Sequence, residues 1–256
     1  MIEALSMKIL IPIRRVMDTD YKIRIDKNGA VNREGIPQIL NPFDAVAIEE
    51  GLLIKEKMGG DVEVVLATVG IEDHEDTLLT GLAMGADRAT LIECDEEPES
   101  FALAAIIKEV ADTESPDLIF TGERIPEDDS DCMGQYLAAF LQWPSAASAS
   151  RVELRDSAAL VDRETDYGIE SIEVPLPSVV TCALRLNEPR YASLRGQMSA
   201  RSKPLQRLKL DDLGTNIENH IEIIDLENVT SHRQCTFVDS PEELLEKLRF
   251  EAKVLG

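Results

Sequence analysis

The loop from Gly122 to Gly134 holds the residues best suited to chemistry. It joins a predicted strand, Asp117–Thr121, to a predicted helix that begins near Met133. Backbone N–H groups at such a helix start can bind phosphate, because they are unpaired and the helix dipole favours negative charge. Four acidic side chains of the loop would repel an anion unless they point away or bind hydroxyl groups: Glu127, Asp128, Asp129 and Asp131. They could equally form an acidic N-cap cluster, so a nucleotide site and a purely structural role both stay open.

Several enzyme signatures are absent from the sequence. There is no GxGxxG after the first predicted strand, no GxxxxGK[ST], no serine nucleophile elbow and no HExxH. The three histidines and four cysteines are scattered along the chain. This spacing argues against a catalytic triad, a disulfide framework and a metal site. Met1–Ser6 resembles neither a secretion signal nor a transit peptide, and Met7 is an alternative start. We therefore expect a cytoplasmic protein that is not a stand-alone enzyme.

A second segment, Leu184–Lys209, is cationic in a chain whose formal net charge is -23. One acidic residue, Glu188, stands among seven basic ones: Arg185, Arg190, Arg195, Arg201, Lys203, Arg207 and Lys209. Such a segment is expected to face a negative surface, although a solvated loop explains the charge equally simply. The acidity of the whole chain argues against nucleic acid or an anionic membrane as partner, and no apolar run is long enough to span a membrane.

The elements around these two segments alternate between strands and helices. This pattern predicts an α/β fold with an open, mostly parallel sheet, flanking helices and right-handed crossovers. The predicted strands are Lys8–Ile13, Val62–Thr68, Ala89–Glu93, Asp117–Thr121 and Ser178–Ala183, and the predicted helices are Asn41 to about Lys57, Asp73–Met84 and Phe101–Val110. Ligands bind beyond the carboxyl ends of such strands, here Pro12–Arg15, Thr68–Gly70 and Gly122–Gly134.

Three other segments depart from this alternation. Val152–Val161 and Gly168–Val174 predict a charged two-stranded ribbon, and Asn28-Gly29 predicts a small hairpin turn after Tyr21–Ile25. Thr215–Gly256 has too little apolar mass for its own core, although Ser240-Pro-Glu-Glu243 is a good helix start. We expect this tail to dock on another surface.

Specific motifs now identify a family. The run Asn187-Glu-Pro-Arg-Tyr-Ala-Ser-Leu194, followed by the basic Met198–Pro204, closely resembles the signature of the electron-transfer flavoprotein beta subunit. Shorter matches occur in the same order along most of the chain: the first strand with Asp18, Asn41-Pro-Phe43, Leu82-Ala-Met-Gly-Ala-Asp-Arg88, Gly134-Gln135 and Trp143-Pro144.

The resemblance implies an electron carrier with a Rossmann-like, adenine-nucleotide-hydrolase-like domain. Members pair with an alpha subunit that holds most of an FAD, and the beta subunit usually buries an AMP. They accept electrons from flavin dehydrogenases such as acyl-CoA dehydrogenase and pass them to a quinone-linked oxidoreductase. The implied division of this chain is an α/β domain at 7–183, a partner-recognition segment at 184–209 and a C-terminal arm at 210–256 that docks on the alpha subunit.

Positions carried over from the family form an expected cofactor site. Its residues are Pro12, Asn41, Phe43, Asp44, Val69, Gly122, Glu127, Asp128, Asp129, Ser130, Asp131, Cys132 and Met133. Backbone groups would bind the AMP, and Phe43 would lie by the flavin. The chain departs from the family pattern at Asp131 and Met133, which replace Asn and Thr, and at Thr19, where some members have an aromatic residue.

The family also implies a docking role for Leu194, which would insert into a hydrophobic pocket of the partner dehydrogenase. The expected partner-binding residues are Tyr191, Leu194, Arg195, Met198, Arg201 and Lys203. Without the resemblance, a leucine here would be expected to fold onto its own domain.

Two alternative functions remain open at this stage. One is a bifurcating member of the family, with a second FAD in place of AMP and NADH as electron donor. The other is a nucleotide-binding module of the stress-protein type, which would form a homodimer without flavin and would not account for the Leu184–Leu194 match.

Overall fold

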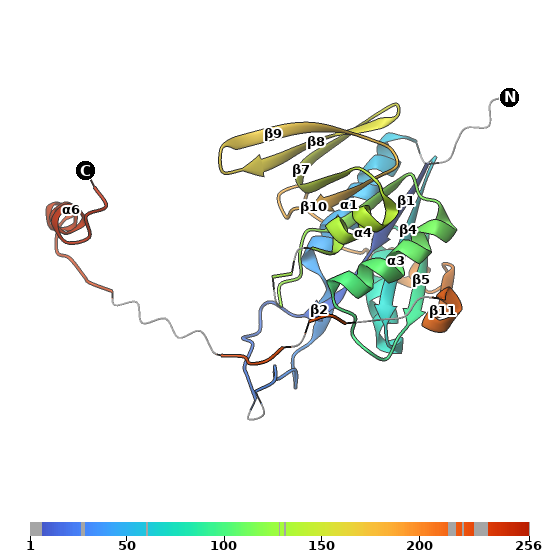
Figure 1. The fold of residues 1–256 in the computed structure, drawn as a ribbon, viewed down its shortest axis with the longest axis horizontal. Helices are drawn as coiled ribbons and strands as arrows, with labels where there is room; N and C mark the ends of the chain where they lie inside the picture. The colour runs from blue at the N-terminus through green and yellow to red at the C-terminus, as the bar shows by residue number, and fades with distance from the viewer. Residues whose placement is uncertain are drawn as a thin grey trace. The chain divides into compact units, whose positions relative to one another are not determined.

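The computed structural model describes residues 7–26, 29–59, 61–127, 129–130, 132–214, 219–221, 223–227 and 235–255 (Figure 1). These residues form two compact units. The larger unit contains the described residues up to Ile23 and those from Arg33 to Ile223, and the smaller contains the described residues of Arg24–Asn32 and those from Ile224 onward.

A sheet of nine strands is the centre of the larger unit. Its order is β11-β5-β4-β1-β6-β10-β7-β8-β9. All neighbouring strands from β11 to β7 are parallel, and β8 and β9 are antiparallel to their neighbours. The bounds are β1 (Met7–Pro12), β4 (Val62–Gly70), β5 (Arg88–Glu93), β6 (Leu118–Gly122), β7 (Ser145–Arg155), β8 (Ala158–Thr165), β9 (Gly168–Pro175), β10 (Ser178–Cys182) and β11 (Leu205–Lys209). The predicted open, mostly parallel α/β fold is confirmed.

Helices cover both faces of this sheet, and each face has its own hydrophobic core. One core lies beneath α1 (Pro42–Lys57), α2 (Glu75–Met84) and α5 (Leu194–Ala200). The other lies beneath α3 (Ser100–Glu114) and α4 (Met133–Leu141). Successive strand residues such as Ile9 and Leu10 enter opposite cores, because side chains alternate across a sheet. The remaining short elements are β2 (Arg15–Met17), β3 (Gln38–Leu40), η1 (Glu72–His74) and η2 (Leu210–Leu213).

The direction of chain winding changes at β1. From β1 the chain adds β4 and then β5 on one side, and it returns through α3 to place β6 on the other side of β1. The loops that follow β1 and β6 therefore lead in opposite directions, and in folds of this kind the crevice that binds ligands lies at such a point. The helix α1 begins beside this crevice as predicted, because Asn41 Oδ1 accepts from the N–H of Phe43 at 3.3 Å and Pro42 occupies the first turn.

The predicted ribbon is present as the antiparallel pair of β8 and β9, but the bounds predicted for its first strand are wrong. Val152–Val161 is not one strand, because the chain turns between β7 and β8, and Asp156 lies in the left-handed region with φ 24°. The strands β7, β8 and β9 instead form an antiparallel extension of the main sheet. The predicted hairpin near Ile25 is represented by an antiparallel bridge between Ile25 and Val31, and Asn28 lies outside the described residues.

The basic segment contains a helix and a strand. After α5, β11 pairs in parallel with β5, with Leu205 opposite Ala89, and forms one edge of the sheet. In the smaller unit, α6 (Pro241–Phe250) begins as predicted: Ser240 Oγ accepts from the N–H of Glu243 at 3.2 Å. The Glu243 carboxylate accepts from the N–H of Asp239 at 3.0 Å, one residue earlier than in an ideal capping box.

Candidate functional site

The carboxyl ends of three neighbouring strands meet at the crevice. Pro12 is the last residue of β1, Gly122 is the last residue of β6, and Val69 is the penultimate residue of β4. Because β4, β1 and β6 are adjacent in the sheet, these predicted site residues share one edge. Asn41, Phe43 and Asp44 join them from the start of α1.

An ion pair between Arg14 and Asp44 connects the end of β1, the start of α1 and the end of β6. The Asp44 carboxylate is fully buried, and the Arg14 side chain is only 11% exposed. Asp44 accepts from Arg14 at its backbone N (2.7 Å), Nε (3.1 Å) and Nη2 (2.8 Å), and from the N–H of Gly122 at 3.0 Å. A Cβ on Gly122 would clash with Asp44 Oδ1, so glycine is required at this contact. The Asp44 carboxylate is therefore fully engaged by the chain itself and holds the end of β6 against the start of α1.

Two further contacts fix the first residues of the loop. Asn41 Nδ2 donates to the carbonyl of Arg124 at 3.0 Å, and Arg14 Nη2 donates to the carbonyl of Gly122 at 3.1 Å. Arg14 lies in the Pro12–Arg15 segment expected to reach a ligand, but it was not among the cofactor-binding residues carried over from the family. The sequence signal for Arg14 is its position directly after a buried strand. Its pairing with Asp44 could not be predicted from this signal, because the two residues are 30 positions apart in the chain.

The acidic residues of the loop bind donors of the chain. Glu127 accepts from the backbone N of Met17 and pairs with Arg33 at 3.4 Å. Asp129, which has φ 58°, pairs with Arg124 Nη1 at 2.8 Å. Asp128 and Asp131 lie outside the described residues. Glu127 and Asp129 are thus partly neutralised, which removes part of the electrostatic objection to an anion at this loop.

The second half of the loop returns toward α3 and α4. The carbonyl of Ser130 accepts from the N–H of Ile125 at 3.1 Å, and the Ser130 and Ser100 hydroxyls lie 2.7 Å apart. Cys132 is exposed, whereas Met133, the first residue of α4, is 2% exposed and packs into the core.

A buried hydroxyl stands beside the start of α4. Thr121 Oγ1 has no hydrogen-bond partner in the part of the chain that the structure describes. A Cβ on Gly134 would lie 2.8 Å from this atom and 2.5 Å from Thr181 Cγ2, so only glycine allows α4 to approach β6 and β10 this closely. An unpaired buried hydroxyl is costly, and an acceptor group of a ligand would satisfy it. The hydroxyl and the helix start together fit a phosphate or nucleotide.

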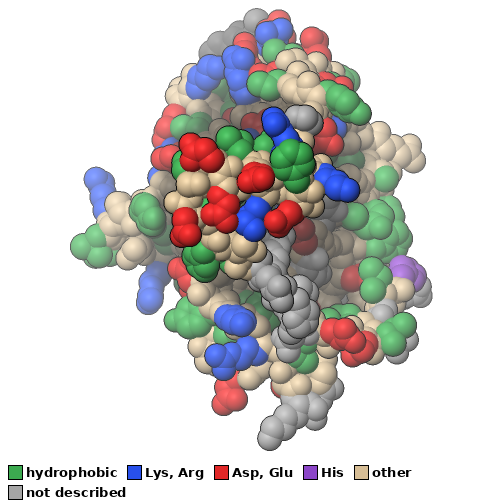
Figure 2. All heavy atoms as spheres, turned by 90° about the vertical axis from the view of Figure 1, so that its left-hand side faces the viewer, with side chains coloured by type: hydrophobic (Ala, Val, Ile, Leu, Met, Phe, Trp, Pro, Cys, Tyr) green, Lys and Arg blue, Asp and Glu red, His purple; other side chains and the backbone are tan. Residues whose placement is uncertain are grey.

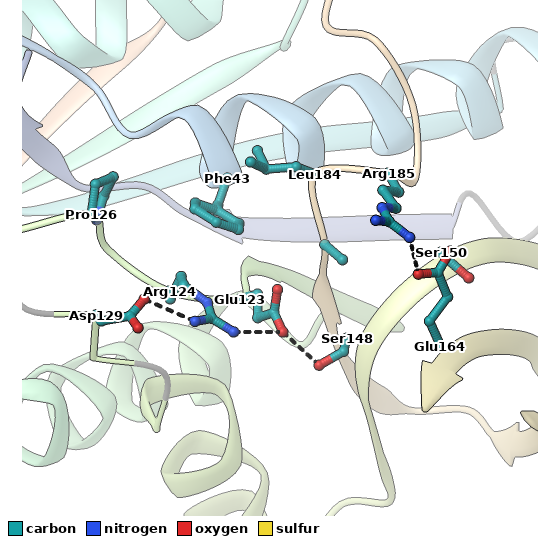
Figure 3. Close-up of a pocket in the computed structure, with 11 residues that line it drawn as sticks. Phe43, Glu123, Arg124, Pro126, Asp129, Ser148, Ser150, Glu164, Leu184 and Arg185 are labelled. Carbon is teal, nitrogen blue, oxygen red and sulfur yellow. Dashed lines mark hydrogen bonds and ion pairs between the residues drawn. The ribbon is translucent and has the colours of Figure 1, made fainter. Parts of the chain in front are cut away.

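A cavity of about 550 Å³ opens beside this loop (Figure 3). The Phe43 ring, from the start of α1, points toward Glu123, while Leu184 and Pro126 add apolar surface. Its other lining residues are polar or small: Glu123, Arg124, Asp129, Ser148, Ser150, Glu164, Ala183 and Arg185.

Two groups of charged side chains line the cavity. Ser148, held in the left-handed region at φ 58°, donates through Oγ to Glu123 Oε1 at 2.7 Å. Arg124 pairs with Glu123 at 3.3 Å and with Asp129, and Arg185 pairs with Glu164 across the cavity. An aromatic wall with charged groups around it fits a planar ring system that has polar edges.

The residues around Leu194 form a second exposed feature. Tyr191, Leu194 and Met198 are 99%, 75% and 74% exposed. Ser193 Oγ caps α5 by accepting from the N–H of Gly196 at 3.0 Å, so Leu194 is the first residue of a helix.

Four of the seven cations in the basic segment bind the chain itself. Arg185, Arg190 and Arg207 form ion pairs with acidic side chains of the larger unit. Lys203 Nζ donates to the carbonyl oxygens of Leu82 and Ala86, at 2.9 and 2.5 Å, and burial lowers its pKa. The others have no ion-pair partner among the described residues: Arg195, Arg201 and Lys209.

Acidic and basic side chains are interspersed on the face drawn in Figure 2, with hydrophobic side chains exposed between them. Within the described ranges, His, Cys, Asp and Glu side chains form no group of three that could hold a metal ion. No helix in that part of the chain is long and apolar enough to cross a membrane.

Comparisons with known proteins agree with these features. Residues 28–213 match the family model described as electron transfer flavoprotein domain. The chain is 44% identical over 253 residues to the mitochondrial electron transfer flavoprotein subunit beta of Arabidopsis thaliana, covering 97% of this chain and 100% of that protein. It is 40% identical over 250 residues to the electron transfer flavoprotein subunit beta of Bradyrhizobium diazoefficiens, covering 97% and 100%. The human protein of that name is 35% identical over 250 residues, covering 95% and 97%.

Proposed function

The chain belongs to the electron transfer flavoprotein beta-subunit family, and we propose that it pairs with an alpha subunit to carry electrons between flavoproteins. The donor would be a flavin dehydrogenase of the acyl-CoA dehydrogenase class and the acceptor a quinone-linked oxidoreductase. The observation that carries this proposal is the Phe43 cavity beside the Gly122–Gly134 loop. It offers an aromatic wall for a shared flavin next to a helix start suited to a phosphate.

We assign the FAD contacts of this chain to the cavity. FAD, held mainly by the alpha subunit, would supply the redox chemistry. The Phe43 ring would cover part of the flavin, and Arg124, fixed between Glu123 and Asp129, would place a positive charge at its edge. These side chains would orient the cofactor and exclude water from it.

We assign a structural AMP to the crevice between β1 and β6. Thr121 would donate its buried hydroxyl to an acceptor of the nucleotide, and the start of α4 would bind phosphate. Backbone groups near Pro12, Val69 and Gly122 would complete the site. Asp44 would act indirectly, because its carboxylate already holds Arg14 and Gly122 in place.

Nucleotide content tests the cofactor assignment. We expect acid release from the complex purified with its alpha subunit to yield one FAD and one AMP per heterodimer. Two FAD molecules would contradict the AMP assignment and indicate a bifurcating member, in which NADH should reduce the complex. A colourless homodimer would contradict the electron-carrier proposal and favour the stress-protein type.

Leu194 is the residue that we propose as the anchor for the dehydrogenase. It is 75% exposed at the start of a helix whose Arg195 and Arg201 supply charge around it. A fully desolvated anchor is worth about 2 kcal/mol or more, which corresponds to roughly thirtyfold in affinity.

Leu194→Ala should therefore raise the KM of the dehydrogenase for the complex by roughly that factor, with flavin content unchanged. The matched control is Ile169→Ala, because Ile169 is also exposed (72%) but lies on β9. Equal KM values for Leu194→Ala and the parent would remove the anchor role.

The smaller unit exposes apolar side chains along α6. In α6, Leu244, Leu245 and Phe250 are 45%, 57% and 66% exposed. A helix that exposes so much apolar surface needs a partner. We propose that α6 docks on the alpha subunit; Leu245→Glu should then weaken heterodimer formation in sedimentation, while Glu246→Ala should not.

A further inference from the structure

The segment that carries Leu194 is attached to α1 at one end and to α2 at the other, and we infer that these attachments position the leucine for docking. The inference rests on the proposed anchor role of Leu194. One attachment, the α1 clamp, joins Asn187 and Arg190 to Glu49, Glu50 and Glu56. The other, the α2 clamp, joins Gly196, Ala200 and Lys203 to α2.

The α1 clamp is centred on Arg190 and Glu49. Arg190 donates through Nε and Nη2 to the two Glu49 carboxylate oxygens at 2.7 and 2.8 Å, which is a bidentate pair. Its backbone N donates to Glu49 Oε2 at 3.1 Å, so both main chain and side chain are fixed. A further bond from Nη1 to Glu56 Oε1, at 2.6 Å, lowers the pKa of Glu56.

Asn187 extends this clamp by one turn along α1. Its Nδ2 donates to the carbonyl of Val46 at 3.1 Å and to Glu50 Oε2 at 3.0 Å. Glu49 and Glu50 are only 4% and 7% exposed, and burial raises the pKa of Glu50. Buried carboxylates are a poor way to stabilise a helix, since apolar residues of similar size would serve as well. Their presence at this contact indicates that they fix the position of the segment.

The α2 clamp uses close packing instead of charge pairs. A Cβ on Gly196 would clash with the carbonyl oxygen of Ala83, so α5 approaches α2 as closely as glycine allows. Ala200, one turn later, is 2% exposed and joins the core. Lys203 then bonds the carbonyl oxygens of Leu82 and Ala86 at the end of α2.

The two clamps hold the backbone on both sides of Leu194 and leave the Leu194 side chain exposed. Residues four apart lie on the same side of a helix, so Gly196 and Ala200 share the side that faces α2. Leu194 and Met198 share a different side, which is exposed. A backbone held this way loses less freedom when Leu194 binds, which lowers the cost of association.

The experiment uses the complete heterodimer as electron acceptor for an acyl-CoA dehydrogenase. We expect Arg190→Gln to raise the KM for the complex roughly tenfold, with kcat and flavin content unchanged. Arg190→Lys should give an intermediate KM, because lysine cannot form the bidentate pair. The control is Arg151→Gln on β7, because Arg151 is exposed and also pairs with two carboxylates, Glu153 at 3.1 Å and Asp162 at 3.5 Å.

A double-mutant test separates positioning from a general structural role. If Arg190 acts through the leucine, Arg190→Gln should have little further effect on KM in the Leu194→Ala background. An equal rise in both backgrounds would overturn the inference, as would a parent-like KM for Arg190→Gln when Leu194→Ala raises KM. A parent-like KM for Leu194→Ala itself would instead refute the proposed anchor. If Arg190→Gln does not fold, Glu56→Gln is the alternative variant, because it removes only the bond between Arg190 Nη1 and Glu56. This variant should raise KM by a smaller factor than Arg190→Gln. An unchanged KM would also overturn the inference.

Discussion

Replacing Asp44 with asparagine should destabilise the chain strongly, although the two side chains have nearly the same shape. The Asp44 carboxylate accepts four hydrogen bonds, three from Arg14 and one from Gly122. An asparagine amide group would place N–H donors opposite donors of Arg14. The Arg14 guanidinium would then be left in a largely buried position without its counter-charge.

The expected loss is about 3–5 kcal/mol, the usual cost of removing one partner from a buried ion pair. Solvent exposure decides this magnitude: the Asp44 side chain is 0% exposed and that of Arg14 is 11% exposed. Exposed pairs contribute only about 0–1 kcal/mol because water screens them. Since total stability is about 5–15 kcal/mol, Asp44→Asn should remove a large share of it.

Urea unfolding of the full chain, followed by the fluorescence of its single tryptophan, Trp143, measures this loss. The matched control is Asp112→Asn, because Asp112 pairs with Lys108 at 2.7 Å but is 52% exposed. The control should change the free energy of unfolding by less than about 1 kcal/mol. A similarly small change in Asp44→Asn would refute the reasoning. Loss of bound nucleotide at unchanged stability would show instead that the carboxylate serves the ligand directly.

Three further outcomes follow from the structure. Gly134→Ala should cost about 1–3 kcal/mol in the same urea assay, because its Cβ would lie 2.5 Å from Thr181 Cγ2. Burial raises the pKa of Glu50 above its ordinary value of 4.5, so the ionised form is disfavoured in the fold. Glu50→Gln should therefore gain stability over the parent above the raised pKa, and a pH series should show no gain below pH 4.5. Hydrogen bonds from Arg88 lower the pKa of Glu114, whose stabilisation is present above 4.5 and is lost as pH falls through the lowered pKa. As pH falls below 4.5, the free energy of unfolding should therefore decrease less steeply for Glu114→Gln than for the parent.

Local signals in the sequence were enough to predict most of the α/β framework. The starts of α1 and α6 are encoded by a capping residue and an adjacent proline, so both follow from a few consecutive residues. Buried strands such as β4 are continuous apolar runs, which is typical of parallel sheets covered on both faces.

Features that depend on distant partners could not be predicted in the same way. The strand β11, Leu205–Lys209, is short and charged, and it becomes a strand only by pairing with β5 more than 100 residues earlier. The turn at Asp156 has no glycine at the position with positive φ, which hid the boundary between β7 and β8. The Arg14–Asp44 pair was missed for a related reason, since each residue alone has an ordinary local role. The cofactor and partner assignments came from family motifs and stay predictions.

The basic segment shows why charge counted along a sequence is a poor guide to surface charge. Arg190 and Arg207 each pair with two or more carboxylates of helices or strands far away in the chain. These cations therefore attach the segment to an acidic body. Lys203 binds backbone carbonyl oxygens, and Arg195, Arg201 and Lys209 have no ion-pair partner among the described residues. Electrostatic steering by so few charges is limited, whereas an exposed leucine on a fixed helix start contributes to how long a complex lasts. The recognition of a dehydrogenase should accordingly depend more on the shape of this segment than on its net charge.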